Sequence, residues 1–347
     1  MEVLRAKHLE ARAPTAASLD SYPDQPPELV PVDIIDDTVT AVAGRLSGGA
    51  RLGGTDSVSL HHWLPCFGAA SGELRLIVGD FTEWLGNGRP PLAAYWALMS
   101  GRLIALDKQP GIIPVVVGET WLRMMVKCLL RVTGQEATAA CGTAQLSGGV
   151  EAGIEGGIHA MRVLWEEHSQ EEYWGVFLIN AQNAFNEENR TAMLWSVWYE
   201  WPSGAQFTFN CYRHWATLVV RDTGEGSGHF LHSKEGMTQG YPLAMISYGI
   251  GVLPLIKELH RAHPLLTQPW YADDSGDGGN FAHILAHLWY LQARGPPRGY
   301  LPELTKIILF VDPQNVARAE EFFCGMGIGV VTGNRYLGGD IGESYCT

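Results

Sequence analysis

Runs of apolar residues and the polar breaks between them divide this sequence into short strands and amphipathic helices. The clearest strand is segment 174–179, Trp-Gly-Val-Phe-Leu-Ile, which has no polar side chain. Such a run is typical of a strand covered on both faces, so we expect it in the middle of a sheet. Trp270 and Tyr271, then the segment after Asp274, predict two more strands joined by a tight turn, because glycine and serine follow the acids.

Helical spacing of apolar residues dominates the first part of the chain. An amphipathic helix is expected over residues 32–46, and helical patterning returns over 63–84 and 121–132. Residues 103–106 and 112–117 predict two strands that pair around a Pro-Gly turn.

Helices and strands alternate in the remainder. A proline-interrupted helix is expected after Gln239, and Pro202 is expected to end the helix before it. Short strands and helices around an apolar strand and an acidic hairpin predict an α+β fold. One more helix is expected to end at about 167, and three others are expected over 187–201, 281–292 and 316–323. Strands are expected over 306–310 and 328–332.

The composition is that of a soluble globular protein. The chain has 347 residues, 46% hydrophobic and 18% charged, which is ample material for a core. The apolar stretch 241–259 is interrupted by Pro242 and Pro254, so we expect a buried helix and no membrane span. The six cysteines are scattered, with no Cys-x-x-Cys pair, and the start has no secretory signal. These features predict an intracellular protein with reduced, buried thiols, in either nucleus or cytoplasm.

The net charge of −13 argues against a broad nucleic-acid-binding surface, which is usually basic. The charge is uneven, however, because the segment 102–131 is basic within an acidic chain. This basic strip is compatible with contact to a phosphate backbone. Its bases are Arg102, Lys108, Arg123, Lys127 and Arg131.

Asp273 and Asp274 are the strongest candidates for chemistry. Neighbouring side chains alternate along a strand, but at a turn both can project the same way. Two adjacent carboxylates repel each other unless a cation lies between them, and hard oxygen ligands suit Mg²⁺. Such a site serves in-line phosphoryl or nucleotidyl transfer, in which two metal ions hold the attacking and leaving oxygens. The alternative is a solvated turn, since Asp and Gly are common turn residues.

Several motifs occur in one order along the chain. The basic strip comes first, the apolar strand leads into Asn-Ala-Phe-Asn at 183–186, and Gln-Gly-Tyr-Pro-Leu follows at 239–243. The Tyr-Ala-Asp-Asp hairpin, a lysine before a strand, and Leu-Gly-Gly at 337–339 complete the series. This order resembles the fingers and palm of reverse transcriptases from retrotransposons without long terminal repeats, over roughly residues 32–342.

The resemblance implies a right-hand polymerase architecture with an antiparallel palm sheet flanked by helices. We expect a mobile arm over residues 1–30, because this segment is rich in Ala, Pro and Ser. A fingers-like region would follow over 31–170, and a palm-like region with the acidic hairpin over 171–347. The family's thumb follows the primer-supporting hairpin, so we expect it to be missing here and supplied by a partner or by a segment outside this sequence.

The resemblance also implies catalytic positions. The family's second and third catalytic aspartates correspond to Asp273 and Asp274, and its first corresponds to Asn180. The three together would hold two Mg²⁺ ions. An amide has no charge and one acceptor oxygen, so Asn180 removes a full negative charge from the site. Changes outside the ligand shell already cost about 10- to 100-fold, and losing a ligand should cost more.

Other positions are implied to contact the nucleotide or the template. Lys108 and Arg123 match basic residues of the fingers, and Phe185 matches an aromatic that closes the space of a ribose 2′-hydroxyl. Gln239 and Gly240 match the segment that packs on the template and the incoming base. A solvated charge, or a core aromatic for Phe185, is the alternative at each place.

Lys306 matches a lysine near the leaving pyrophosphate that can protonate it. Tyr336, Leu337 and Gly338 match the hairpin that supports the primer end, with a plain structural turn as the alternative. Ile113 stands where the family usually has an arginine before a proline, so a second charged contact to the triphosphate is lost.

Two functions follow from the resemblance. The first is an RNA-directed DNA polymerase by descent, with an RNA template, a DNA primer and dNTPs as partners, impaired by Asn180. The second is a catalytically dead scaffold that binds nucleic acid, or a fossil of a mobile element. An unrelated soluble α/β protein with an acidic surface turn is the third reading.

Overall fold

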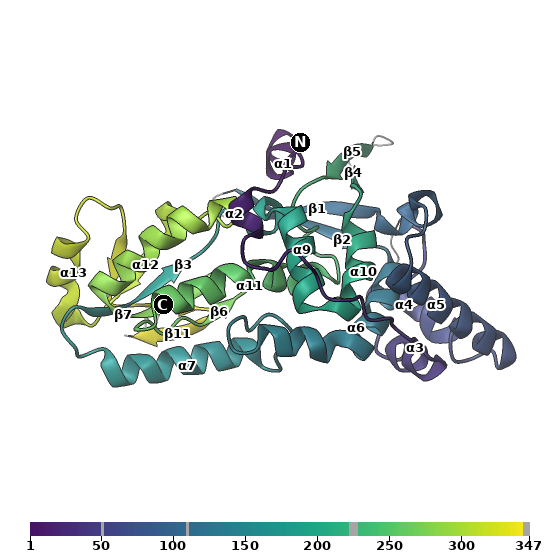
Figure 1. Cartoon of the computed structure of the whole chain (residues 1–347), viewed down its shortest axis with the longest axis horizontal. Helices are drawn as coiled ribbons and strands as arrows, with labels where there is room; N and C mark the ends of the chain where they lie inside the picture. Colours follow the sequence, from purple (N-terminus) through teal and green to yellow (C-terminus); the bar gives the residue numbers. More distant parts are fainter. Residues whose placement is uncertain (50–51, 109–110, 222–227, 343–347) are drawn as a thin grey trace.

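The structure is a computed structural model that describes residues 1–49, 52–108, 111–221 and 228–342 (Figure 1). Helices α3 (Asp36–Ala43), α4 (Ser57–Trp63) and α5 (Ala69–Asn87) lie at one end of an elongated molecule, and α13 (Val316–Phe322) lies at the other. The long helices α6 (Thr120–Cys141) and α7 (Gly153–His168) follow each other along one side and connect the two ends (Figure 1).

The apolar run of the sequence is the middle strand of a sheet. In the described residues, β3 (Trp174–Ile179) is the centre of a five-stranded sheet, as predicted. Its neighbours pair antiparallel, whereas the edge strand β9 pairs parallel with β8. The sheet was predicted to be antiparallel, but its β8–β9 pair is parallel. Helix α13 crosses between these two strands, and a helical crossover is what a parallel pair requires. The order is β6 (Trp270–Tyr271), β7 (Asp274–Asn280), β3, β8 (Ile308–Phe310) and β9 (Gly329–Val331).

Helices cover both faces of this sheet. Strand β7 turns a small residue toward one helix and a buried aspartate toward the other. A Cβ atom on Gly278 would lie 2.1 Å from Leu164 Cδ2, so α7 packs directly on the strand backbone. On the opposite face, Asp277 Oδ2 lies 3.1 Å from Nδ1 of His287 in helix α12 (Phe281–Arg294), and both side chains are fully buried. The flanked sheet matches the expected architecture.

A second sheet has four strands in the described part of the chain, in the order β2 (Ile112–Gly118), β1 (Gly101–Asp107), β4 (Ala216–Arg221) and β5 (Gly228–Ser233). The β1–β2 hairpin was predicted, although residues 109–110 of its turn lie outside the described residues. Strands β4 and β5 were not predicted. They come from beyond residue 170, so the predicted boundary there does not separate the two sheets.

Two predicted helices have different bounds. Helix α3 begins at Asp36 and not at 32, because Asp36 and Asp37 occupy its first turn, where acidic side chains favour the positive end of the helix. Pro202 ends the preceding helix as predicted and also opens α10 in its first turn, where the missing N–H costs nothing. The central helices are α8 (Ala184–Glu187), α9 (Arg190–Glu200), α10 (Pro202–Tyr212) and α11 (Ala244–Ala262).

The N-terminal segment has short helices, α1 (Glu2–Lys7) and α2 (Ala16–Leu19), and specific contacts with the body. Arg298 donates an Nη1–H to the Ser18 carbonyl over 2.8 Å, and Trp198 donates its Nε1–H to the Pro27 carbonyl over 3.0 Å. Hydrogen bonds, one of them buried, therefore tie residues 1–30 to the body at these two points, whereas a mobile arm was expected there.

No helix in the described residues is long and apolar enough to cross a membrane. The cysteines in that part of the chain are free thiols: Cys128, Cys141 and Cys211 are buried as expected, whereas Cys66 and Cys324 are exposed.

Candidate functional site

The two aspartates lie at the tip of the hairpin formed by β6 and β7. Tyr271 pairs with Asp274 across the hairpin, which leaves Ala272 and Asp273 as the turn residues. Ala272 has a φ of +52°, in the left-handed region. This tight reversal lets two consecutive carboxylates lie at one end of the sheet.

Asn180 follows the last residue of β3 and meets this tip. The register between β3 and β7 places Ile179 opposite Ser275, so the next residue of β3 lies beside Asp274. Asn180 donates an Nδ2–H to Asp274 Oδ1 over 2.6 Å, although the two residues are 94 positions apart. The expected convergence of the apolar strand and the acidic hairpin is present.

Two buried side chains hold the turn. Gln145, which is fully buried, donates Nε2–H to the Ala272 carbonyl over 3.0 Å and accepts the Ala272 N–H at 2.8 Å. Tyr300 donates its hydroxyl to the Asp273 carbonyl over 2.9 Å. These bonds satisfy turn backbone that would otherwise be buried without partners, so the carboxylates have fixed positions.

Burial and mutual repulsion shape the electrostatics of the pair. Burial, with a further contribution from the Asp274 charge, raises the pKa of Asp273 to about 7. Burial also raises the pKa of Asp274, while the Asn180 hydrogen bond and the Lys108 charge act in the opposite direction. A site of this kind favours a proton or a cation next to Asp273.

The donor set can be tested against the expected Mg²⁺. Mg²⁺ is commonly held by one or two carboxylates together with substrate phosphates, and Asp273 with Asp274 fits that pattern. Asn180, however, turns an N–H toward Asp274 and adds no charge. Among the described residues, no group of three or more His, Cys, Asp or Glu side chains is placed to hold a metal ion. The residues fit one divalent cation on the aspartate pair and do not fit the charge of two.

A polar cleft opens beside Asp273 and Asn180. Predicted residues from four separate segments line it: Lys108, Phe185, Gln239 and Lys306. Ile113 lies in the same wall. Phe185 also packs on Tyr248, with ring centroids 4.7 Å apart, so the implied nucleotide contact and the core alternative are both present in its geometry. We call this hollow the first cleft.

A second cleft lies on the Asp274 side and shares Lys108, Asn180 and Lys306 with the first. Tyr336, Leu337 and Gly338 line it: Tyr336 ends β10 (Gly333–Tyr336), and the other two form the turn to β11 (Gly339–Gly342). The Tyr336 hydroxyl donates to the Pro269 carbonyl over 3.1 Å, which ties this hairpin to the strand before the aspartates.

Two predicted residues do not line either cleft. Arg123 lies on α6 and donates an Nη1–H to the Ser47 carbonyl over 2.7 Å, so it ties α6 to the loop after α3. Gly240 packs on β2: its φ is +96°, and a Cβ there would lie 2.3 Å from the Val116 carbonyl oxygen. Its close backbone approach is made to this protein's own strand.

Sequence reasoning missed four residues of the site, one of them Tyr300, which donates to the Asp273 carbonyl. Glu303 and Lys7 line the first cleft, and Gln145 holds the turn. None belongs to a motif, and each arrives through long-range packing. The Glu303 N–H donates to the Asn180 carbonyl over 2.9 Å, which places the η4 segment (Leu304–Lys306) beside the end of β3.

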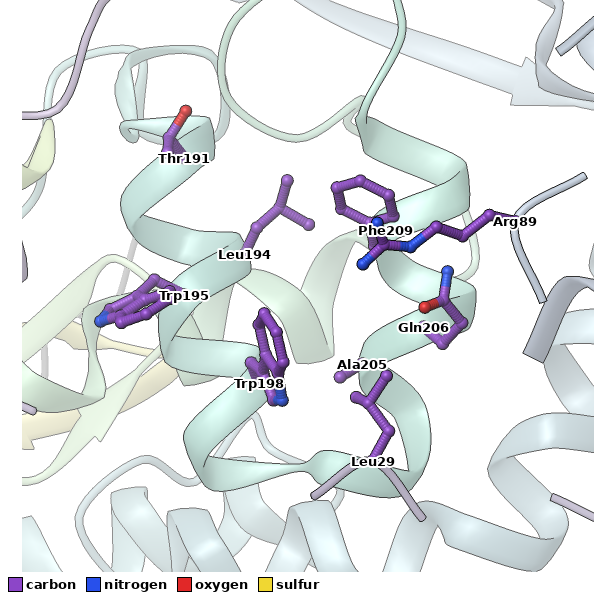
Figure 2. Close-up of a pocket in the computed structure, with 9 residues that line it drawn as sticks. All are labelled: Leu29, Arg89, Thr191, Leu194, Trp195, Trp198, Ala205, Gln206 and Phe209. Atoms are coloured by element: carbon purple, nitrogen blue, oxygen red, sulfur yellow. The ribbon is translucent and has the colours of Figure 1, made fainter. Parts of the chain in front are cut away.

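A separate cavity of about 190 Å³ lies between α9 and α10 (Figure 2). Its walls are mainly apolar, with Leu194, Trp195 and Trp198 on one side and Phe209 on the other (Figure 2). Arg89 covers the Phe209 ring at 5.4 Å from its centroid. None of the predicted site residues lines this cavity and its described lining contains no acid, so the candidate chemistry lies at the two polar clefts.

No model of a known protein family and no curated protein matches this sequence. Solved structures do match. Apo telomerase from Candida tropicalis, truncated from its C-terminal domain, is 11% identical with a TM-score of 0.50, and the match covers 71% of this chain and 53% of that one. Telomerase from Candida albicans in complex with a telomeric RNA fragment is 10% identical with a TM-score of 0.49, covering 73% and 47%.

This chain therefore spans about half the length of the solved structures that it matches. Identity of 11% reports on the fold alone. The match supports the polymerase architecture expected from the motifs and gives no support for the narrower likeness to retrotransposon enzymes. Telomerase is a polymerase of the reverse-transcriptase family, and with its four- and five-stranded sheets, an acidic hairpin and this neighbour, the chain has a reverse-transcriptase-like fold.

Proposed function

We propose that this chain is an RNA-directed DNA polymerase by descent whose nucleotidyl transfer is impaired by Asn180. The observation that carries the proposal is the 2.6 Å contact between the Asn180 amide and Asp274. The end of β3 and the acidic tip converge as a two-metal site requires, but one of the three expected carboxylates is an amide.

The first cleft supports roles for this chain's own residues. Lys108 and Lys306 are positioned to attract phosphate oxygens, and Phe185 with Gln239 lies where the resemblance places the sugar and the template base. Asp273 and Asp274 would hold a magnesium ion, which when bound supplies charge neutralisation for the reacting phosphate. The second cleft, with Tyr336 to Gly338, would support the primer end.

A second function, a scaffold that binds nucleic acid without catalysis, is favoured by a separate observation. Ile113 lines the first cleft at the place of a family arginine, so a second charge for the triphosphate is absent at that position. Loss of one metal ligand and one triphosphate contact would affect chemistry more than binding of a primer–template duplex.

Primer extension by wild type and Asn180→Asp, with Mg²⁺ or Mn²⁺, tests the proposal. We expect Asn180→Asp to extend a DNA primer on RNA at least about 10-fold faster than wild type, because it restores the missing carboxylate. Asn334→Asp is the matched control: it adds the same charge in the second cleft, but on strand β10 and not at the end of β3.

The outcomes separate the readings. Extension by Asn180→Asp alone indicates a decayed active site, and extension by both proteins indicates an active enzyme. Duplex binding without extension by either protein favours the scaffold. Failure of wild type to bind duplex even at low salt would contradict both functions and leave the unrelated-protein reading.

A further inference from the structure

We propose that Lys7, on the N-terminal helix α1, forms part of the nucleotide site and binds the triphosphate of an incoming nucleotide together with Lys108 and Lys306. The inference rests on the proposed function and identifies which part of the chain recognises the phosphates. No motif led to Lys7, because it lies in the segment expected to be a mobile arm.

The position of Lys7 comes from packing. Helix α1 contacts strand β2, and its Leu4 side chain is 6% exposed. The helix ends at Lys7, which lines the first cleft with Asp273 and Lys108. A residue at the start of the sequence therefore faces the acidic tip.

Hydrogen bonds fix this end of the helix. Asn183, in the wall of the first cleft, donates an Nδ2–H to the Lys7 carbonyl over 3.0 Å. The following segment is also held, since Arg12 Nη1 lies 3.2 Å from Glu187 Oε2 and the Arg12 N–H donates to Glu235. Lys7 therefore lines the cleft from a backbone position that is anchored.

The charges in this wall call for an anion. Neither the Lys7 nor the Lys108 ammonium has an ion-pair partner within the described residues, and Lys306 lies 3.5 Å from Glu303. The first cleft thus carries three cations from three separate segments against two carboxylates, Asp273 and Glu303, so a net positive charge is left for an anion. Lysine binds phosphate as a mobile point charge, and a triphosphate offers several oxygens to such groups.

Lys7 also compensates for the charged triphosphate contact that is lost at Ile113. Ile113 and Lys7 line the same cleft, and an apolar side chain makes no charged contact with phosphate. A lysine that enters from α1 supplies positive charge to this cleft by a different route. The nucleotide is favoured over a nucleic-acid backbone because this cleft also holds Phe185 and Gln239, where the sugar and base are proposed to lie.

Calorimetric titration of the full chain with dGTP, inorganic tripolyphosphate and deoxyguanosine, each with Mg²⁺, tests the assignment. We expect Lys7→Gln to weaken dGTP and tripolyphosphate roughly 5- to 20-fold, because a charge-assisted contact is lost. Lys7→Arg should restore most of the affinity. Arg5→Gln is the matched control: it removes the same charge from the same helix, but Arg5 is exposed and does not line the cleft.

Several results would overturn the inference. Equal losses in Lys7→Gln and Arg5→Gln would mean that only long-range charge matters. A weaker duplex with unchanged dGTP would assign Lys7 to the nucleic-acid backbone. Unchanged dGTP in Lys7→Gln, together with a loss in Lys108→Gln, would remove Lys7 and leave the proposed function standing. No dGTP or tripolyphosphate binding by wild type would remove both. Equal thermal denaturation of the variants checks that all are folded.

Discussion

The Asn180 N–H offsets part of the repulsion between the Asp273 and Asp274 carboxylates, as a bound cation would. Its hydrogen bond to Asp274 lowers the pKa of that carboxyl against the larger effect of burial, so Asp274 is stabilised as a carboxylate without a metal. An aspartate at 180 would add charge and remove the N–H donor. The substitution that restores catalysis should therefore destabilise the metal-free protein and make its stability depend on divalent ions.

Asp273 gives a prediction for pH. Its folded pKa of about 7 lies above the ordinary aspartate value of 3.8, so the folded state holds this proton more tightly than the unfolded state. The stability that this carboxyl contributes is complete below the unfolded pKa and is lost as pH rises through about 7. Because the same proton competes with a cation, Mn²⁺ affinity should rise over that range.

Urea denaturation without metal and Mn²⁺ titration, at about pH 5 and about pH 8, check this prediction in wild type and Asp273→Asn. The difference in unfolding free energy between the two proteins separates the effect of Asp273 from that of other groups that titrate in the same pH range. Wild type that gains stability relative to Asp273→Asn as pH rises would contradict the assigned direction.

At the scale of elements, the loop between β5 and α11 brings Gln239 to the first cleft by packing on β2. The Val116 N–H donates to the Gln239 carbonyl over 2.8 Å, and Gly240 makes the next contact with the same strand. The Gln-Gly pair thus joins the β1–β2 hairpin to the segment that leads into helix α11.

Gly240→Ala should be strongly destabilising. Gly240 and Gly111 have nearly equal positive φ values, +96° and +97°, but a Cβ meets backbone at 2.3 Å only at Gly240 and nothing within 4 Å at Gly111. We expect Gly111→Ala to lower the free energy of unfolding by about 1–2 kcal/mol from backbone strain, and Gly240→Ala by about 3 kcal/mol or more. Denaturant titration measures both, and equal losses would show that contact with β2 does not matter.

The sequence predicted elements where one local signal dominates. Segment 174–179 was found because every side chain in it is apolar, and the acidic tip because two aspartates precede a glycine-rich strand. Helix α10 was not predicted, because Pro202 was assigned only to the end of the preceding helix. Proline also occurs in the first turn of a helix, as it does in α10. Lys7, Gln145 and Glu303 could not be found from local patterns, since their roles depend on segments more than a hundred residues away.

At the scale of the molecule, a net charge of −13 limits how nucleic acid can bind. Lys7, Lys108 and Lys306 line the clefts, while Arg335 in the second cleft is held by Asp340 at 3.0 Å. Because these three lysines are assigned to the triphosphate of the nucleotide, few cations remain for the backbone of a duplex. The plot of log affinity against log salt should therefore have a slope no steeper than about −1.

Fluorescence anisotropy of a labelled primer–template duplex at several salt concentrations measures this slope. The double variant Lys127→Gln/Arg131→Gln changes the basic strip on α6 and should leave the slope unchanged. A wild-type slope of about −3, reduced in that variant, would show that the strip binds the backbone.

The bond from Arg298 to the Ser18 carbonyl spans 280 positions and sets an order of events during synthesis. At about 5–20 residues per second, a ribosome needs roughly 14–56 s to reach the second partner after making the first. Until then the nascent amino-terminal segment has no docking partner there and is open to chaperones. Lys7 is likewise translated before its anchor, because Asn183 lies 176 positions further along the chain.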